Sequence, residues 1–324
     1  MIPAITRRTV LGGLAASAVL PAHGDEAWPG RSITLIHGVA PGSPSDAVAR
    51  VLADGLSERI GQQIIVDPRP GAAGRVAAGQ VARATPDGHT LMVIPAGHAI
   101  SAALYKELPY RPIADFTTVS LLSEIPLIVV TSADSSVHTL NDLIAIGRER
   151  AKPLLFGSAG NGSLQHLAGE LLSNTVNLTF QHVPYRGSAQ PITDLIAKRI
   201  DFIVDIPTAQ MRAIRSGRVR ALSVTSAKRF FRLPDVPTTA EAGLPNYAFT
   251  AWQGLVGPAG MPQPLVERIN LAVAAAFSDP AIVERMRSLG HEPALSSPEE
   301  LKTRLTADVE KWSKLVETAS LDRI

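Results

Sequence analysis

The sequence of 324 residues contains no cysteine. Disulfide bonds and thiolate metal sites are therefore excluded. There is also no low-complexity tract and no collagen-like or coiled-coil repeat, so the composition is that of a globular protein. The length allows two domains of ordinary size with a sizeable buried core.

Surplus charge of either sign is also lacking. The formal net charge is +2, and Arg7 and Arg8 supply all of it, because the remaining 29 basic and 29 acidic residues balance. The sequence shows no basic cluster of the kind that nucleic-acid binding needs. We therefore expect no nucleic-acid partner.

Enzyme signatures are missing as well. The sequence has no G-x-S-x-G, no G-x-x-x-x-G-K-[ST], and residues 160–165 lack the last glycine of G-x-G-x-x-G. His166 and Glu170 would share a helix face, but two ligands make a poor metal site. We expect a protein that is not an enzyme and holds neither a cofactor nor a metal.

The first 24 residues are typical of a targeting segment. Thr6–Leu11 has a twin-arginine pattern, and an apolar run over Val10–Leu20 and the small-residue end Ala22–Gly24 follow it. The run is too short for a membrane span of about 20 residues. A frayed N-terminal helix is the alternative. We expect export to the periplasm, cleavage near Gly24 and a mature chain that is soluble, since no later segment has the length of a membrane helix.

The mature sequence alternates strand-like and helix-like segments at a spacing that favours βαβ units and largely parallel sheets. Strands are expected at 32–38, 63–67, 90–94, 127–131, 154–158, 178–182, 202–205 and 221–225. Helices are expected at 45–60, 74–84, 140–150, 163–174, 188–197 and 209–216.

The C-terminal part is nearly all helix, at 264–277, 281–289 and 299–320. We place crossings between two lobes near 123–126 and 225–237. Residues 25–125 and 226–324 then form one lobe and residues 126–225 the other. A chain that crosses twice has a hinge with a cleft beside it.

A first turn of small residues, Ala40 to Asp46, joins the strand at 32–38 to its helix. Ser43 occupies the N-cap position, Pro44 the first helical position and Asp46 the third, a near match to a capping box. Backbone N–H groups at a helix N-terminus favour an anion, although any tight connection looks similar. The candidate ligand contacts here are Ala40, Pro41, Gly42, Ser43, Ser45 and Asp46.

A second turn, Gly157 to Ser163, has three glycines and two serines, which is more backbone freedom than a connector requires. Like the first turn it joins a strand to a helix, so the two would grip a small carboxylate from both ends. His166 either contacts the ligand or caps and packs at its helix start. The candidate contacts are Ser158, Gly160, Asn161, Gly162, Ser163 and His166.

A third segment, Val183 to Ala189, follows the next strand, and ligands bind at the carboxyl ends of strands in open α/β sheets. Arg186 is the one basic residue in these turns and pairs with a carboxylate or is a surface cation. Asp205 ends an apolar strand, where it would repel a plain diacid, hold the ammonium of an amino acid, or cap the next segment. The candidates added here are Tyr185, Arg186, Gly187, Ser188, Ala189 and Asp205.

Several blocks in order resemble the Bug (tripartite tricarboxylate transporter) family of extracytoplasmic solute-binding proteins. They are Trp28-Pro29, Pro41–Asp46 with Ala49-Arg50, Val66–Gly74, Pro86–Leu91, Val183–Gly187, Leu233–Thr238, Glu241–Gly243 and Trp252–Leu255. The resemblance implies a type II periplasmic-binding-protein fold, in which two α/β lobes joined by a two-crossing hinge close over one ligand. In that family backbone amides and ordered waters hold the ligand, usually a carboxylate. Ser43 departs from the family pattern by replacing a glycine, and His89 departs by replacing a tyrosine.

The function expected from residues and resemblance together is capture of a small organic carboxylate. The candidates are a di- or tricarboxylate, an acidic amino acid and an aromatic acid. The expected partners are the membrane permease subunits of a tripartite transporter, and the alternative partner is a membrane sensor kinase. We expect a monomer.

Overall fold

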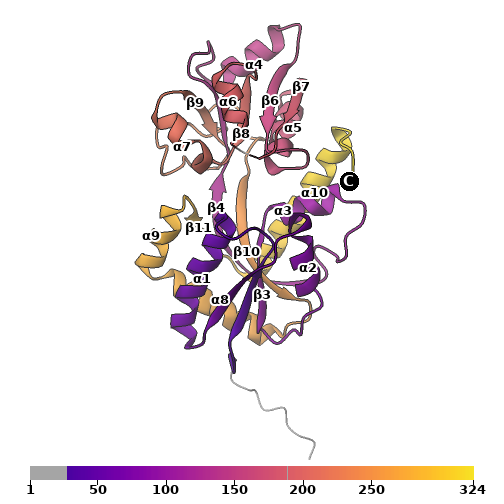
Figure 1. The fold of residues 1–324 in the computed structure, drawn as a ribbon, viewed down its shortest axis with the longest axis vertical. Helices are drawn as coiled ribbons and strands as arrows, with labels where there is room; N and C mark the ends of the chain where they lie inside the picture. Colours follow the sequence, from indigo (N-terminus) through magenta and orange to yellow (C-terminus); the bar gives the residue numbers. More distant parts are fainter. Residues whose placement is uncertain (1–27, 188) are drawn as a thin grey trace, which may run out of the picture.

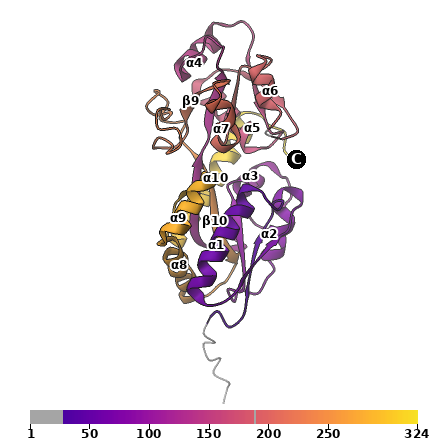
Figure 2. The ribbon, with the colours of Figure 1, turned by 60° about the vertical axis from the view of Figure 1, so that its left-hand side comes forward.

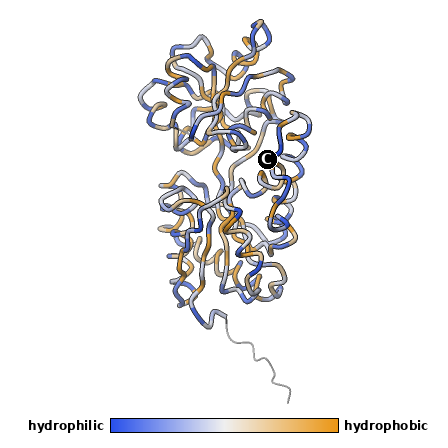
Figure 3. Tube along the Cα trace, turned by 45° about the vertical axis from the view of Figure 1, so that its right-hand side comes forward, coloured by the Kyte–Doolittle hydropathy of each residue, from blue (hydrophilic) through white to orange (hydrophobic). Residues whose placement is uncertain are grey.

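The computed structural model describes residues 28–187 and 189–324, so the twin-arginine segment at 1–24 lies outside the described residues. The chain forms two α/β lobes stacked along the long axis of the molecule (Figure 1). Hydrophobic stretches run through the interior of both lobes, whereas hydrophilic stretches are common on the outer loops (Figure 3). The predicted α/β architecture with two lobes is confirmed.

The first lobe contains a six-stranded sheet in the order β11-β4-β10-β3-β1-β2. β1 is parallel to β2 and β3, whereas β10 is antiparallel to both β3 and β4. Its strands are β1 (Ile33–His37), β2 (Ile64–Pro68), β3 (Thr90–Pro95), β4 (Phe116–Pro126), β10 (Thr250–Pro258) and β11 (Glu292–Pro293).

Helices cover both faces of this sheet (Figure 2). One face packs against α1 (Pro44–Ile60), α8 (Gln263–Phe277) and α9 (Pro280–Ser288), and the other against α2 (Arg75–Val81), α3 (Gly97–Leu104) and α10 (Pro298–Thr318).

Successive side chains of β10 show the two faces directly, because neighbours on a strand point to opposite sides. Trp252 Nε1 donates to Asp308 Oδ2 of α10 at 2.7 Å, whereas Gln253 Nε2 donates to Ser45 Oγ of α1 at 2.8 Å.

The second lobe contains a five-stranded sheet in the order β7-β6-β8-β5-β9. β6 is parallel to β7 and β8, and β5 is antiparallel to β8 and β9. Its strands are β5 (Ile128–Ser132), β6 (Leu154–Ser158), β7 (Phe180–Pro184), β8 (Phe202–Asp205) and β9 (Val219–Val224). Its helices are α4 (Leu140–Glu149), α5 (Leu164–Val176), α6 (Pro191–Ile196) and α7 (Pro207–Arg215).

Some elements differ from the sequence-based expectation. β4, β10 and α3 were not predicted. The helix expected at 74–84 is the shorter α2, preceded by the 3-10 turn η1 (Ala72–Gly74). The physical reason is a backbone with positive φ at Ala72, Ala73 and Gly74, where Gly74 packs directly against Gly38 at the end of β1.

The chain passes between the sheets after β4 and again before β10, and one buried residue joins both passages. The backbone of Thr225 accepts from Phe249 N at 2.8 Å, and its N–H donates to Leu127 O at 2.9 Å. Its hydroxyl oxygen also accepts from Leu127 N at 2.9 Å. Thr225 therefore ties the outgoing segment, the end of β9 and the returning segment together.

We predict that Thr225→Val lowers the free energy of unfolding by about 1–3 kcal/mol, because the buried N–H of Leu127 loses its acceptor while the side-chain volume is kept. Urea denaturation measures the change. Thr34→Val is the matched control, because the Thr34 hydroxyl makes no side-chain hydrogen bond within the described part of the chain. Equal losses in the two variants would contradict the prediction.

Candidate functional site

The first turn is shaped by the buried carboxylate of Asp46. It accepts from Gly42 N at 2.9 Å and from Arg50 Nε at 3.0 Å, and His37 Nε2 lies 2.9 Å from its other oxygen. Ser43 is the N-cap of α1, as predicted, and its hydroxyl accepts from Asp46 N at 3.3 Å. The side chain of Asp46 thus closes the turn on Gly42 instead of returning to the N-cap N–H as in a capping box.

Burial alone would raise the pKa of the Asp46 carboxyl. The hydrogen bonds from Arg50, Gly42 and His37 outweigh burial and lower that pKa to about 2. Asp46 is only 3% exposed and is ionised at neutral pH. Its charge is balanced inside the turn, which leaves the backbone of Ala40 to Ser43 as the outer surface.

Gln253 of β10 reaches the same turn through its hydrogen bond to Ser45, and both residues are buried. The amide oxygen of Gln253 has no hydrogen-bond partner within the described residues. Gln253 was not predicted as a site residue. Because neighbours on a strand point to opposite faces, its position next to Trp252 could have indicated that the two side chains lie on different sides of the sheet.

The second turn repeats the construction of the first. Ser163 is the N-cap of α5, and its hydroxyl accepts from His166 N at 3.2 Å. His166 Nδ1 in turn accepts from Gly162 N at 3.1 Å, as Asp46 accepts from Gly42. Gly42 and Gly162 have nearly equal φ values of 77° and 74°. Residues 42–46 and 162–166 are therefore two copies of one turn, each closed by the third helical side chain.

The side chains of Ser158 and Ser163 also bind within the second turn. Gly160 N donates to Ser158 Oγ at 3.1 Å, and Ser163 Oγ donates to Gly160 O at 2.7 Å. Gly160 has a φ of 124°, a conformation that side-chain-bearing residues rarely adopt. Asn161 lies exposed at the tip. The side chains of Ser158 and Ser163 thus stabilise the turn from inside.

His182 of β7 packs against the second turn, a contact that was not predicted from the sequence. Its ring stacks on His166 with centroids 3.8 Å apart, and its Nε2 lies 2.6 Å from Ser158 Oγ. Burial, with a smaller electrostatic contribution from the neighbouring His166, lowers the pKa of His182 to about 4. His182 is therefore neutral at neutral pH.

The third segment lies against the second turn. Tyr185 N donates to Ser158 O at 3.1 Å, and Gly187 N donates to Ala159 O at 3.3 Å. The Tyr185 hydroxyl donates to Asp194, and burial together with this hydrogen bond raises the pKa of Tyr185 to about 12. Arg186 and Ala189 are exposed, and within residues 28–187 and 189–324 no carboxylate pairs with Arg186. Ser188 lies outside the described residues.

Asp205 ends β8 and is only 4% exposed. It accepts from Gln165 Nε2 at 2.9 Å, from Gln210 Nε2 at 2.6 Å and from Ile206 N at 2.8 Å. Burial raises the pKa of this carboxyl, although the three donors oppose the shift. The hydrogen bond to Ile206 N fits the capping alternative, and the two amides tie α5 and α7 to the end of the strand.

The second turn approaches the first lobe. A side chain at Gly162 would meet Leu104 of α3 at 2.9 Å. α3 follows the carboxyl end of β3, and β3 pairs in parallel with β1. The second turn follows the carboxyl end of β6 and approaches α3, so the carboxyl ends of the parallel strands in each lobe face the other lobe. The structure thus assigns the first turn to one lobe, and the second turn, the third segment and Asp205 to the other.

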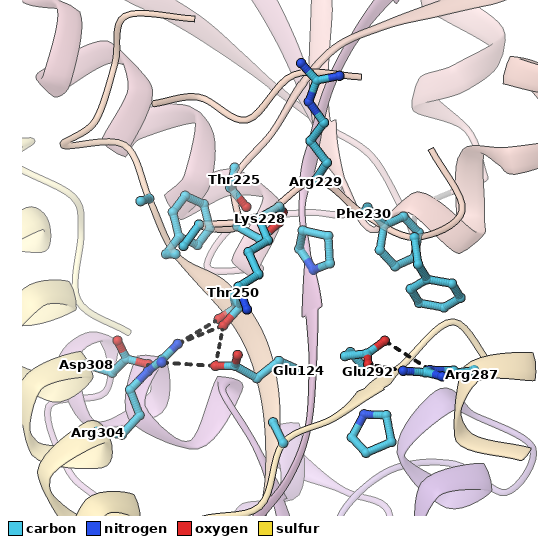
Figure 4. A pocket seen from close by; sticks show the side chains of 18 of the residues that line it. Glu124, Thr225, Lys228, Arg229, Phe230, Thr250, Arg287, Glu292, Arg304 and Asp308 are labelled. Atoms are coloured by element: carbon cyan, nitrogen blue, oxygen red, sulfur yellow. Dashed lines mark hydrogen bonds and ion pairs between the residues drawn. The ribbon is translucent and has the colours of Figure 1, made fainter. Parts of the chain in front are cut away.

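One cavity lies elsewhere, beside the hinge, and none of the predicted ligand contacts lines it. We call it the hinge pocket. Its volume is about 730 Å³, and Figure 4 shows it in front of the two crossing strands. It is lined by residues 124, 126, 225–231, 248–250, 287, 292–294, 304, 308 and 311.

No group of three or more histidine or acidic side chains that could hold a metal occurs in the described ranges. In the same residues no helix is long and apolar enough to cross a membrane.

We predict that Asp46→Asn lowers the free energy of unfolding at pH 7 by about 2 kcal/mol. The folded-state pKa lies below the usual value of 3.8, so the ionised carboxyl stabilises the fold above about pH 4, and this contribution is lost as the pH falls towards 2. The difference from the wild type should therefore shrink below pH 4 in urea denaturation. Asp54→Asn, an exposed position on the same helix, is the control, and equal stability of Asp46→Asn and wild type at pH 7 would refute the prediction.

The family model of the tripartite tricarboxylate transporter family receptor matches residues 48–321. A UPF0065 protein from the tcbD-tcbE intergenic region of Pseudomonas sp. strain P51 is 39% identical over 316 residues, covering 96% of this chain and 94% of the relative.

Two solved structures are also similar. Periplasmic binding protein BugD has 32% identity and a TM-score of 0.72, covering 91% of this chain and 99% of its own. R. palustris Rpa4515 with adipate has 33% identity and a TM-score of 0.75, covering 90% and 98%. These matches confirm the predicted resemblance and the periplasmic-binding-protein fold. The chain belongs to the tripartite tricarboxylate transporter receptor family, a family of solute-binding proteins.

Proposed function

We propose that the protein binds a small organic carboxylate between its two lobes and that its preferred ligands are dicarboxylates. The observation that carries the proposal is the pair of matching turns, 42–46 in one lobe and 162–166 in the other. Each begins a helix, where the N–H groups of the first turn of helix have no backbone acceptor and the helix dipole favours an anion. A diacid carries one anionic group for each turn.

The acidic side chains near these turns do not oppose that role. The charge of Asp46 is balanced by Arg50 and by the donors around it, and Asp205 already accepts from three groups. Since a carboxylate has about four lone-pair positions, Asp205 has little capacity left for the ammonium of an amino acid. We therefore favour diacids without an amino group, and the adipate bound to the related Rpa4515 is of this class.

In this proposal the guanidinium group of Arg186 supplies a positive charge that pairs with the ligand. Its side chain is exposed, stands beside the second turn, and is not neutralised by a carboxylate within the described residues. Guanidinium groups bind carboxylates with two parallel hydrogen bonds. Closure of the lobes brings this group onto the ligand, and the ligand in turn shifts the population to the closed form.

The proposed partners are the membrane permease subunits of a tripartite transporter, as the family description suggests. A sensor kinase as the receiver of the closed form is the alternative. Co-purification of the ligand-loaded protein with the products of neighbouring genes separates the two.

We predict that one or more of succinate, malate and adipate bind the refolded, ligand-free protein in calorimetry more tightly than aspartate and glutamate do. Arg186→Gln should weaken the tightest of them by about tenfold, because one charge-assisted contact is lost. Its melting temperature without ligand should not change. Arg148→Gln, another exposed arginine of the same lobe, is the control.

If none of the acids bind, or if an unrelated class of compound stabilises the protein instead, the carboxylate proposal is wrong. If the acids bind equally well to Arg186→Gln and to the wild type, the proposed ligand class is supported but the proposed role of Arg186 is wrong.

Export through the twin-arginine pathway is proposed for residues 1–24. Replacing Arg7 and Arg8 together by lysine keeps the charge and should leave the full-length precursor in the cytoplasm, as measured by cell fractionation. Undiminished arrival of the mature chain in the periplasm would show that another pathway exports it.

A further inference from the structure

The hinge pocket lies on the side of the crossing strands away from the first turn. Thr250 and Trp252 of β10 contact Arg304 and Asp308 of α10, whereas Gln253, the next residue along the strand, points to the opposite face and contacts the first turn. The pocket lies between α10 and the end of α9, with Glu124 and Thr250 at its base (Figure 4). It is therefore separate from the site proposed between the matching turns.

Apolar side chains line much of the pocket. Phe230 and Phe249 are buried, and Phe231 lies against Phe230 with ring centroids 4.7 Å apart. Phe231 is 41% exposed, so part of its ring is open to a bound molecule. Pro126 and Pro293 add to the lining, and the volume is within the range of small-molecule sites. These walls fit an aromatic or similarly flat apolar body.

The charges of the pocket mostly cancel in pairs. Arg287 pairs with Glu292 at 2.7 Å. Arg304 pairs with Glu124 at 3.1 Å, and Lys311 pairs with Asp308 at 2.8 Å.

Two lining cations remain, and they differ. Arg229 is held by Glu241 at 3.0 Å and by the carbonyl of Pro234, and it points away from the pocket (Figure 4). Lys228 points into the pocket towards Thr250 in the same view, and among the described residues it has no ion-pair partner. The pocket thus contains a single uncompensated positive charge.

We propose that the hinge pocket is a second ligand site, which binds a small monocarboxylate with an aromatic body. The carboxylate pairs with Lys228, and the ring packs against Phe231 and its aromatic neighbours. A monoanion matches the one uncompensated cation, whereas a diacid would leave a second carboxylate facing Glu124, Glu292 and Asp308. The ligand of this site therefore differs in class from the ligand proposed between the lobes.

The test uses fluorobenzoate as the probe and the whole mature protein, with binding followed by fluorine NMR. Lys228→Gln should weaken binding by about tenfold, and Phe231→Ala should weaken it several-fold. The matched controls, Lys152→Gln and Leu271→Ala, remove an exposed lysine and an exposed leucine elsewhere and should bind as the wild type does. Arg186→Gln should also leave probe binding unchanged. Both pocket side chains are exposed, and melting curves verify that the variants fold.

Benzylamine, which has the same ring with the opposite charge, should not compete with the probe. The proposal is overturned if fluorobenzoate does not bind at millimolar concentration, or if Lys228→Gln and Phe231→Ala bind it as the wild type does. It is also overturned if Arg186→Gln alone abolishes binding, because the probe then occupies the site between the lobes.

Discussion

Both passages between the lobes depend on the hydrogen bonds of one buried residue, Thr225. Its carbonyl, N–H and hydroxyl hold Leu127 at the start of β5 and Phe249 just before β10. These hydrogen bonds hold three segments in one compact contact, so the two passages between the lobes are tied to each other. The antiparallel pairing of β4 with β10, from Phe116 opposite Pro258 to Pro126 opposite Thr250, carries this contact rigidly into the first lobe.

The two matching turns use the same arrangement of side chains to fix their shape. In each turn a serine caps the helix and the third helical residue, Asp46 or His166, binds back to a glycine N–H. The side chains fix the shape of each turn, and the dipole of the helix that follows favours an anion beside it. A helix start of this kind suits the anion binding proposed above, and the chain belongs to a family of solute-binding proteins.

Much of this arrangement follows from local sequence. Strand and helix alternation predicts most of the βα units because buried parallel strands are apolar and their helices are amphipathic. β4 and β10 are less regular: β4 mixes serine and threonine with apolar residues, and β10 contains two glycines. These two strands are stabilised by pairing with each other, although they lie more than a hundred residues apart in the sequence. A short stretch of sequence therefore does not reveal them.

The side-chain partners were harder to predict than the turns. The N-cap role of Ser43 depends on neighbours in the chain and was predicted, whereas the contact of Gln253 with Ser45 joins residues 208 positions apart. The contacts of His182 and the place of Lys228 in the hinge pocket depend on tertiary packing, because a lone histidine or lysine carries no signal of its own in the sequence.

The hydrogen bond from Trp252 to Asp308 has an optical consequence. The chain has only three tryptophans. Trp252 lies on a crossing strand and Trp312 on the adjoining helix, beside Lys311 and Phe249. Trp28 is bound to Gly88 O at another place in the first lobe. The partners of these two indoles, Asp308, Lys311 and Phe249, all line the hinge pocket. A ligand that alters these contacts should therefore change the tryptophan emission, which can be followed without attaching a dye.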